Sequence, residues 1–250
     1  MVAALTALLA LVGGTSAIAP AGASTLKPPP TAAARFHWGK PTHADEFGHV
    51  GAPSKWWSVY NGLGHHNQGH RSPKAWRGNG SVMTVKGDAH GTTGGMSANW
   101  KGSDVKGGRW EVRMRTSARD PRYHPVLILW PQDGYKRGKC DGEVDFSEST
   151  RNTGQTHFYL HHGCANKQTS KVITNNTRAW HTYAVEWVPG RWMRGFIDGR
   201  LWFADYKVGD LPPRPMHLTL QLDYFPKDGK GALKPSWMQV DWARQYPLHR

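Results

Sequence analysis

Short segments in which apolar and polar residues alternate constrain this chain more than any other feature. In residues 108–116, Trp110, Val112 and Met114 alternate with charged residues without exception. Because successive side chains of a strand point to opposite faces, this pattern is typical of a half-buried strand. Further strand-like segments span residues 81–85, 125–131, 180–188, 191–197, 200–203, 216–223 and 238–242. The chain is therefore rich in short strands.

The connections between these segments also favour β-structure. Asp198-Gly199 separates residues 191–197 from residues 200–203, and this dipeptide is a strong signal for a two-residue β-hairpin. No segment has the periodicity of an amphipathic helix. We predict an all-β sandwich or barrel rather than an α/β fold.

The length of 250 residues suits one all-β domain with a large core. Residues 1–23 contain an apolar stretch followed by Ala21-Gly22-Ala23, a pattern typical of a signal peptide and its cleavage site. We expect a secreted, extracellular protein with no membrane span in the mature chain. Residues 24–35 are expected to form a flexible tail, and residues 36–250 the folded domain.

The net charge narrows the class of partner. A formal charge of +14 at pH 7 is compatible with nucleic acid, an anionic surface or an acidic polymer. The sequence has no run of five basic residues and no recognisable nucleic-acid-binding module. We expect no nucleic-acid partner and a monomer with a scattered basic surface, which favours adhesion to anionic cell walls.

One six-residue stretch holds the carboxylates Glu143, Asp145 and Glu148. In a regular strand Glu143 and Asp145 would share one face, and Glu148 would lie on the other with Val144 and Phe146. One extra residue between Asp145 and Glu148, as in a β-bulge, would turn Glu148 to the side of Glu143. All three carboxylates would then line one cleft.

Such a cluster suits a retaining glycosidase, in which two carboxyl groups lie about 5–5.5 Å apart. One attacks the anomeric carbon and the other protonates the leaving oxygen, and their mutual repulsion raises the pKa of one of them. The alternatives are an acidic surface strand and a site for a hard cation. The apolar residues Val144 and Phe146 argue against the surface strand.

The stretch Glu-Val-Asp-Phe-Ser-Glu resembles the Glu-x-Asp-x-x-Glu signature of glycoside hydrolase family 16, in the bulged form of laminarinases and related β-glucanases. The likeness extends from Phe36 to Tyr246 and includes the order of further motifs. These are Asp45-Glu46-Phe47, the strand that begins at Gly108 and Val240-Asp241-Trp242. The resemblance implies a β-jelly-roll sandwich of two curved antiparallel sheets with a concave substrate cleft.

Carried over by position, the resemblance implies roles for the three carboxylates. Glu143 is expected to be the nucleophile, Glu148 the acid/base, and Asp145 the residue that tunes the nucleophile. The candidates for sugar contacts are Trp110, Trp130, His161 and Gln221. For Trp130 the alternative is a place in the core, and for His161 it is a buried histidine bonded to the backbone.

The cysteines Cys140 and Cys164 are compatible with one disulfide in an oxidising compartment. If residues 140–148 and 156–164 pair as an antiparallel hairpin, Cys140 faces Cys164 and Glu143 faces His161. The alternative is two unrelated buried thiols. We predict the disulfide.

No cofactor is required for the expected chemistry, and no metal ligand is assigned. Asp241, with Glu46 or nearby carbonyls, resembles the position of a structural Ca²⁺ in some relatives, which makes that ion an optional addition. The histidines between Trp56 and Trp76 lack the companion ligands of a zinc site. Tryptophan or tyrosine side chains in that region, Trp57 or Tyr60, are further candidates for sugar contacts.

These observations together predict a secreted endo-acting retaining hydrolase of a polysaccharide. The leading substrates are β-1,3-glucan and mixed β-1,3-1,4-glucan. Agarose, carrageenan, xyloglucan and transglycosylation remain open, because relatives with the same signature use them. The alternatives without enzymatic activity are a lectin-like glucan-binding protein and a basic cell-wall adhesion protein. Neither accounts for the presence of Glu143, Asp145 and Glu148 together.

Overall fold

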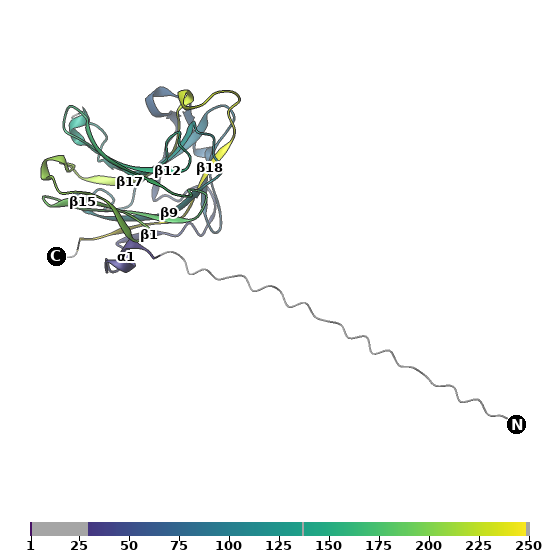
Figure 1. Cartoon of the computed structure of the whole chain (residues 1–250), viewed down its shortest axis with the longest axis horizontal. Coiled ribbons are helices and arrows are strands. Elements are labelled where there is room, and N and C mark those ends of the chain that lie inside the picture. The colour runs from purple at the N-terminus through teal and green to yellow at the C-terminus, as the bar shows by residue number, and fades with distance from the viewer. Residues whose placement is uncertain (2–29, 137, 249–250) are drawn as a thin grey trace.

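The computed structural model describes Met1, residues 30–136 and residues 138–248. The predicted signal peptide lies outside the described residues apart from Met1, as do residues 24–29 of the predicted tail. The described chain forms two stacked layers of strands, and a short helix lies beneath the lower layer in Figure 1. The predicted all-β jelly-roll sandwich is confirmed.

The outer sheet is the lower layer in Figure 1 and contains nine strands. In spatial order they are β16 (Arg200–Asp205), β15 (Trp192–Ile197), β14 (His181–Val188), β9 (Gly108–Thr116), β18 (Ser236–Tyr246), β7 (Met83–Gly87), β6 (Trp76–Asn79) and β2 (Val50–Gly51), with β1 (His43–Asp45) paired to β18. All these pairings are antiparallel.

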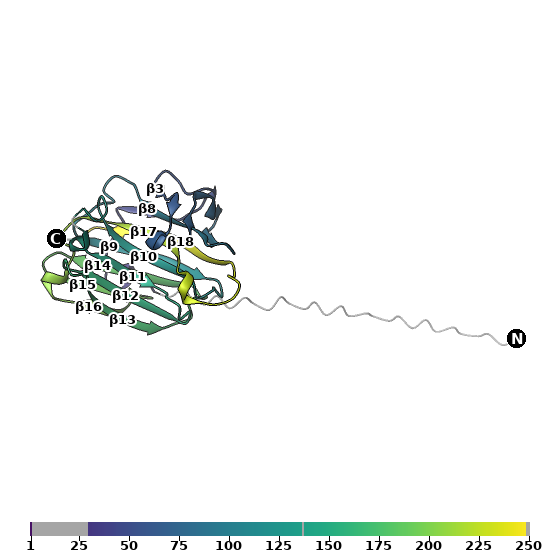
Figure 2. The same ribbon diagram turned by 90° about the horizontal axis from the view of Figure 1, so that it is seen from above.

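The concave sheet is the upper layer and also contains nine strands, which lie side by side in Figure 2. Their order is β13 (Lys167–Thr174), β12 (Gln155–His162), β11 (Glu143–Glu148), β10 (Tyr123–Pro131), β17 (Met216–Tyr224), β8 (Thr92–Ala98), β5 (His70–Arg71) and β4 (Gly62–Leu63), with β3 (Trp57–Val59) paired to β8. Only the short β5–β8 pairing among these described strands is parallel.

The helices of the described chain are all short. They are α1 (Ala32–Arg35) and the 3₁₀ turns η1 (His65–Asn67), η2 (Pro73–Ala75), η3 (Gly138–Asp141), η4 (Val208–Asp210) and η5 (Pro226–Asp228). Within the described residues no helix has the length and apolar character needed to cross a membrane.

The main core lies between the two sheets, as the alternating patterns predict. Its buried side chains include Trp110, Val112, Met114, Tyr183, Val185 and Trp187 from the outer sheet and Leu127, Leu129, Phe146, Phe158, Leu218, Leu220 and Leu222 from the concave sheet. Phe158 stacks on Phe203 with ring centroids 3.8 Å apart. A Cβ at Gly195 would lie 2.6 Å from the Phe158 ring, so this close approach requires glycine.

The predicted turn at Asp198-Gly199 is also present. It joins β15 to β16, and the φ angles of the two residues are 49° and 68°. A type I′ turn requires positive φ at both central positions, and this dipeptide supplies them at low cost. The predicted hairpin is confirmed.

The folded domain begins before residue 36, where the flexible tail was predicted to end. Thr31 caps α1 by accepting a hydrogen bond from Ala34, and the backbone N–H of Ala32 donates to Glu111 Oε1 at 2.5 Å. Ala32 is buried against Trp38 on the outer face of the outer sheet. The tail prediction is wrong for residues 32–35, because these contacts to distant strands leave no local pattern in the sequence.

Candidate active site

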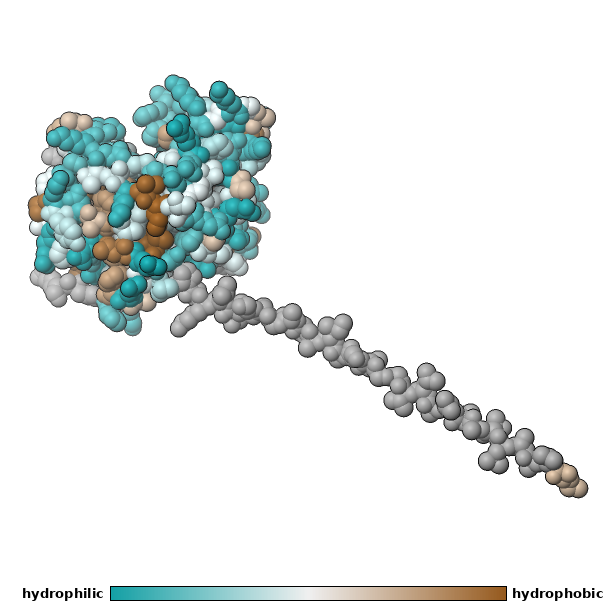
Figure 3. Space-filling view, viewed as in Figure 1, coloured by the Kyte–Doolittle hydropathy of each residue, from teal (hydrophilic) through white to brown (hydrophobic). Residues whose placement is uncertain are grey.

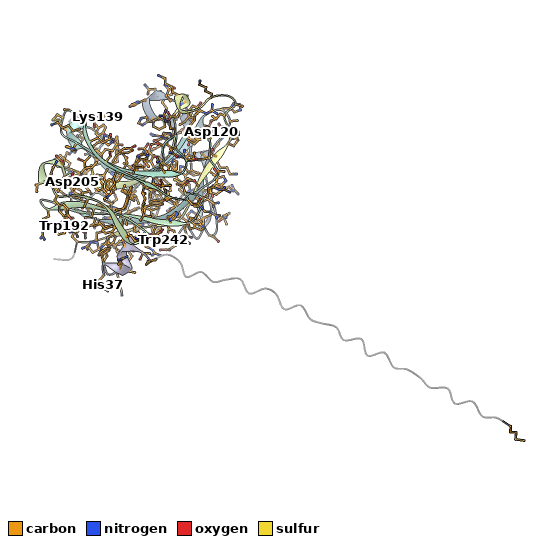
Figure 4. All side chains as sticks on the ribbon, viewed as in Figure 1. His37, Asp120, Lys139, Trp192, Asp205 and Trp242 are labelled. Carbon is orange, nitrogen blue, oxygen red and sulfur yellow. A yellow bond between two sulfur atoms is a disulfide. The ribbon has the colours of Figure 1, made fainter. Side chains whose placement is uncertain are left out.

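A cleft of about 920 Å³ lies over the concave sheet. Strands β10, β11, β12 and β17 supply its floor, and the notch at the top of Figure 3 shows its opening. One wall carries Lys139, which Figure 4 labels at the rim on the left. The facing wall is built from the segment around η1 together with Phe225, whose ring lies 4.8 Å from that of His65.

The carboxylates of β11 reach this cleft because the strand is bulged. Glu143 pairs with His161, and Glu148 pairs with His157, with a register shift between Asp145 and Glu148. Glu143, Asp145 and Glu148 all line the cleft, whereas the alternate side chains Val144 and Phe146 are buried in the core. The predicted bulge and the predicted pairing of Glu143 with His161 are both confirmed.

Glu143 is held by a neighbouring tyrosine. The Tyr135 hydroxyl donates a hydrogen bond to Glu143 Oε2. Burial raises the pKa of Glu143, while the Tyr135 hydrogen bond and the nearby Lys139 ammonium act to lower it. These two groups favour the ionised form that a nucleophile needs.

Asp145 lies between the two glutamates and is buried. Burial, and next the charges of Glu143 and Glu148, hold the pKa of Asp145 well above its ordinary value. Asp145 also shares a hydrogen bond with Glu143. When Asp145 carries a proton, it is the donor in that hydrogen bond and Glu143 the acceptor.

Glu148 faces a buried histidine. His124 Nδ1 lies 3.4 Å from Glu148 Oε1, and the His124 side chain is only 3% exposed. On the other side of the ring, Nε2 lies 2.8 Å from Asp228 Oδ2. Glu148 itself keeps an edge open to the cleft, which suits proton exchange with a bound molecule.

Three of the four predicted sugar-contact residues line the cleft, namely Trp130, His161 and Gln221. Trp130 is partly exposed and packs against Tyr135, with ring centroids 4.5 Å apart. His161 Nε2 lies 3.5 Å from Asp145 Oδ2, which places this histidine beside the carboxylates. Gln221 Oε1 is buried and has no hydrogen-bond partner among the described residues.

The fourth residue, Trp110, is not in the cleft, and its prediction as a sugar contact is wrong. It is fully buried on β9 of the outer sheet, within the core. Trp110, Val112 and Met114 share one strand face, and that face packs toward the concave sheet. The alternation that identified the strand therefore also directs Trp110 into the core.

The two further candidates, Trp57 and Tyr60, have different places in the structure, which also adds cleft residues that the sequence analysis did not single out. Tyr60, a candidate from the loop region, lines the cleft, whereas Trp57 is buried and donates to Asp45 Oδ2 at 2.8 Å. Arg71 Nη2 pairs with Asp223 Oδ1 at 2.6 Å in the cleft. Polar cleft residues that the sequence analysis had not marked as binding residues include Arg71, Tyr135, Tyr159 and Asp223. Asp223 lies two residues after Gln221 on β17, so both side chains point to the same face of the sheet. This spacing could have identified Asp223 from the sequence.

The predicted disulfide joins Cys140 in η3 to Cys164 after β12. It attaches η3, in the connection between β10 and β11, to the end of the hairpin that β11 and β12 form. The pairing follows the register predicted from the sequence.

The residues proposed for Ca²⁺ do not form a fitting ligand set. Asp241 Oδ2 pairs with Arg113, and both oxygens of Glu46 accept hydrogen bonds from Arg244 at 2.8 and 2.9 Å. A guanidinium therefore occupies the place beside each carboxylate where a cation would bind. In the part of the chain that the structure describes, no three His, Cys, Asp or Glu side chains gather as a metal site.

Solved structures similar to this chain share its fold. The laminarinase from Rhodothermus marinus has a TM-score of 0.74 at 20% identity, covering 84% of this chain and 98% of that chain. The catalytic domain of an endo-1,3-β-glucanase (laminarinase) from Thermotoga petrophila RKU-1 has a TM-score of 0.72 at 16% identity, covering 84% and 98%. SCLam, a non-specific endo-β-1,3(4)-glucanase, has a TM-score of 0.70 at 20% identity, covering 84% and 91%.

Sequence comparison assigns the family. No curated protein matches the chain by sequence. The model of the glycosyl hydrolases family 16 matches residues 70–244, a range that contains Glu143, Asp145 and Glu148. The predicted family is confirmed: the chain belongs to glycosyl hydrolases family 16 and is a glycoside hydrolase.

Proposed function

We propose that this protein is a secreted, retaining endo-β-glycosidase that hydrolyses β-1,3-glucan or mixed β-1,3-1,4-glucan. The bulge in β11 carries the proposal, because it brings Glu143, Asp145 and Glu148 into one cleft. The names of the similar structures, which are laminarinases and endo-β-glucanases, support glucan as the substrate.

In the first step Glu143 is the nucleophile. One of its carboxylate oxygens forms a bond to the anomeric carbon while the bond from that carbon to the glycosidic oxygen breaks. Glu148 gives its proton to the departing oxygen. The products are a glycosyl ester on Glu143, an ionised Glu148 and the released part of the polymer.

In the second step Glu148 acts as a base. It takes a proton from water as the water oxygen bonds to the anomeric carbon, and the bond to Glu143 breaks. Two displacements at one carbon retain its configuration. Both carboxyl groups return to their starting protonation states.

Asp145 assists Glu143 in both steps. As a buried neutral acid it donates a hydrogen bond to Glu143, which orients the carboxylate and balances its charge. This role suits its place between the two glutamates. His161 Nε2 lies beside Asp145, so this histidine can contact either the bound sugar or the Asp145 carboxyl group.

The shape of the cleft supports endo action. It is an open notch between two walls in Figure 3 and not an enclosed cavity. A polymer can therefore lie across the concave sheet and be cleaved at an internal bond. Trp130 offers a partly exposed indole in the floor, on which a sugar ring can stack.

Secretion is supported by two features. The N-terminal residues 1–23 have the pattern of a signal peptide, and the Cys140–Cys164 disulfide suits an oxidising compartment. N-terminal sequencing of protein from culture medium tests it, with a mature start near Ser24 expected.

Product analysis tests the function. The purified protein is incubated with laminarin, mixed-linkage glucan, xyloglucan, agarose and carrageenan, and early products are examined by chromatography and ¹H NMR. We expect oligosaccharides from laminarin or mixed-linkage glucan, formed first as the β-anomer, and none from Glu143→Gln. Products from agarose or carrageenan alone would reassign the substrate. Binding without hydrolysis of any polymer would favour the lectin-like alternative.

A further inference from the structure

The connection between β10 and β11, residues 132–142, places a tyrosine against the proposed nucleophile. The Tyr135 hydroxyl donates to Glu143 Oε2, and Tyr135 lines the cleft. We propose that Tyr135 is a positioning residue for Glu143, holding one carboxylate oxygen fixed through both displacement steps. This inference rests on the proposed role of Glu143 as the nucleophile.

The surroundings of Tyr135 show how its ring is held. The Trp130 ring lies 4.5 Å from it with an interplanar angle of 47°, and Lys139 Nζ lies 4.5 Å from the ring centroid. The disulfide between Cys140 and Cys164 fastens the same connection to the end of β12. The Tyr135 ring is therefore held by Trp130 and Lys139, as a preorganised hydrogen-bond donor requires.

Glu143 needs such a donor because of its environment. Burial raises its pKa, and the acidic neighbours raise it further, whereas Tyr135 and Lys139 oppose both effects. The other charged or titratable groups that line the cleft with Glu143 are Tyr60, His65, His66 and Arg71 on the facing wall, Asp145 and Glu148 on β11, Tyr159 and His161 on β12, and Asp223 on β17. Of the groups with the largest effect on the Glu143 pKa, Glu148 and Asp223 raise it, whereas Tyr135 and Lys139 lower it, so the phenol is one of two such groups that stabilise the carboxylate.

The hydrogen bond remains useful after the covalent bond forms. In the glycosyl ester, the oxygen held by Tyr135 becomes the ester carbonyl oxygen, which still accepts from a phenol. When water attacks, negative charge returns to the carboxyl group as the ester bond breaks. A donor already in place stabilises that charge without rearrangement.

Tyr135→Phe removes only the hydroxyl and tests this role. Because the donor that lowers the Glu143 pKa is gone, the acid limb of the pH profile of kcat/KM for laminarin should move to higher pH. The activity at neutral pH should fall about 10- to 100-fold, the usual effect of deleting a hydrogen bond to a charged group. The matched control is Tyr206→Phe, which makes the same change at an exposed tyrosine of the surface. An unchanged acid limb in Tyr135→Phe would overturn the proposal.

The pKa of Glu143 can also be measured without substrate, in a sample that reports whether the variant is folded. ¹³C NMR of carboxyl-labelled glutamate, with the Glu143 signal assigned by its loss in Glu143→Gln, should give a higher pKa for Glu143 in Tyr135→Phe. The fold is checked in the same sample by the unchanged signals of distant glutamates. An identical Glu143 titration in both proteins would contradict the inference.

Covalent trapping separates this inference from the proposed function. Wild-type protein treated with 2,4-dinitrophenyl 2-deoxy-2-fluoro-β-laminaribioside should carry the label on the peptide that contains Glu143, and Tyr135→Phe should label about 10- to 100-fold more slowly. A label absent from wild type, or found on another residue, would refute the proposed function. Labelling of Glu143 at equal rates in both proteins would refute only the role of Tyr135.

Discussion

At the scale of single residues, Asp145 is the most informative member of the site. It is buried, its pKa is held well above the ordinary value by burial and by Glu143 and Glu148, and it shares a hydrogen bond with Glu143. These properties describe a carboxyl group that acts as a donor. An amide can imitate part of that role, whereas a methyl group cannot.

The comparison of Asp145→Asn with Asp145→Ala tests this role. We expect Asp145→Asn to reduce kcat/KM on laminarin strongly but less than Glu143→Gln does, because both reacting groups remain. Asp145→Ala should lose about tenfold more than Asp145→Asn, the value of one hydrogen bond to a charged group. Equal losses in the two variants would contradict the role of Asp145 as a hydrogen-bond donor.

Sequence patterns predicted some residues well and others poorly, for physical reasons. The structure brings Glu143, Asp145 and Glu148 into one cleft, because the bulge that their spacing suggested is present. Trp110 was wrongly placed, because an indole suits a core as well as a sugar, and only the facing direction of its strand decides between them. Tyr135 was missed because its segment has no periodicity, and its partner is fixed by the fold of the connection and not by strand register.

At the scale of elements, the hairpin of β11 and β12 was the most predictable part. Strand pairing converts residue numbers into neighbours, so residue spacing alone matches Cys140 to Cys164 and Glu143 to His161. In contrast, α1 could not be predicted. Four residues have little intrinsic helicity, and α1 depends on its contacts with Glu111 and the outer sheet.

The packing of α1 over Glu111 predicts that the stability of the fold depends on pH. Burial beneath α1 raises the pKa of Glu111 to about 7, above its ordinary 4.5. Between these values the unfolded chain loses this proton and the folded chain keeps it, so stability is full below pH 4.5 and falls as the pH rises through 7. The loss from this one group is on the order of 3 kcal/mol.

Urea unfolding at pH 5 and pH 8 measures this effect. Glu111→Gln cannot ionise, so the free energy of unfolding of the variant should change less between these pH values than that of wild type. Its amide oxygen can still accept from the N–H of Ala32, which keeps the helix contact comparable. The same pH dependence in both proteins would show that Glu111 does not titrate in this range.

At the scale of the whole molecule, the basic charge lies partly on a face away from the cleft. On the outer sheet, Arg115 lies 4.7 Å from the ring centroid of Trp180, and Arg191 lies 4.5 Å from that of Trp192. Figure 4 labels Trp192 on the lower layer, away from Lys139 at the cleft rim. Variants of these arginines can therefore be made without changing a residue that lines the cleft.

We expect the outer face to bind anionic cell walls without affecting catalysis. Raising the salt concentration from about 0.05 to about 0.5 M should release the protein from walls, because the Debye length shortens from more than about 10 Å to less than about 8 Å. Turnover of soluble laminarin, a neutral polymer, should stay nearly constant. Arg115→Gln combined with Arg191→Gln should weaken wall binding in the same selective way. A parallel loss of binding and turnover would contradict this separation.

The whole fold was more predictable than its boundaries. The number and alternation of strands set the sandwich, and the order of motifs identified the family that the comparison confirms. The short strands β3, β4 and β5 were not predicted, since each has two or three residues and takes its conformation from its neighbours. Residues of β4 and β5 line the cleft. Local sequence patterns therefore predict secondary structure least well where tertiary contacts determine the backbone conformation.

The division of labour between Glu143 and Glu148 is the central claim, and azide rescue tests it most directly. With an aryl β-laminaribioside that has a good leaving group, Glu148→Ala should still form the glycosyl ester, because little protonation is needed. Azide needs no general base, so it should attack the ester and give a β-glycosyl azide. Glu143→Ala should form no ester, and azide entering from the opposite face should give the α-glycosyl azide. An α-azide from Glu148→Ala and a β-azide from Glu143→Ala would reverse the two roles and contradict the account.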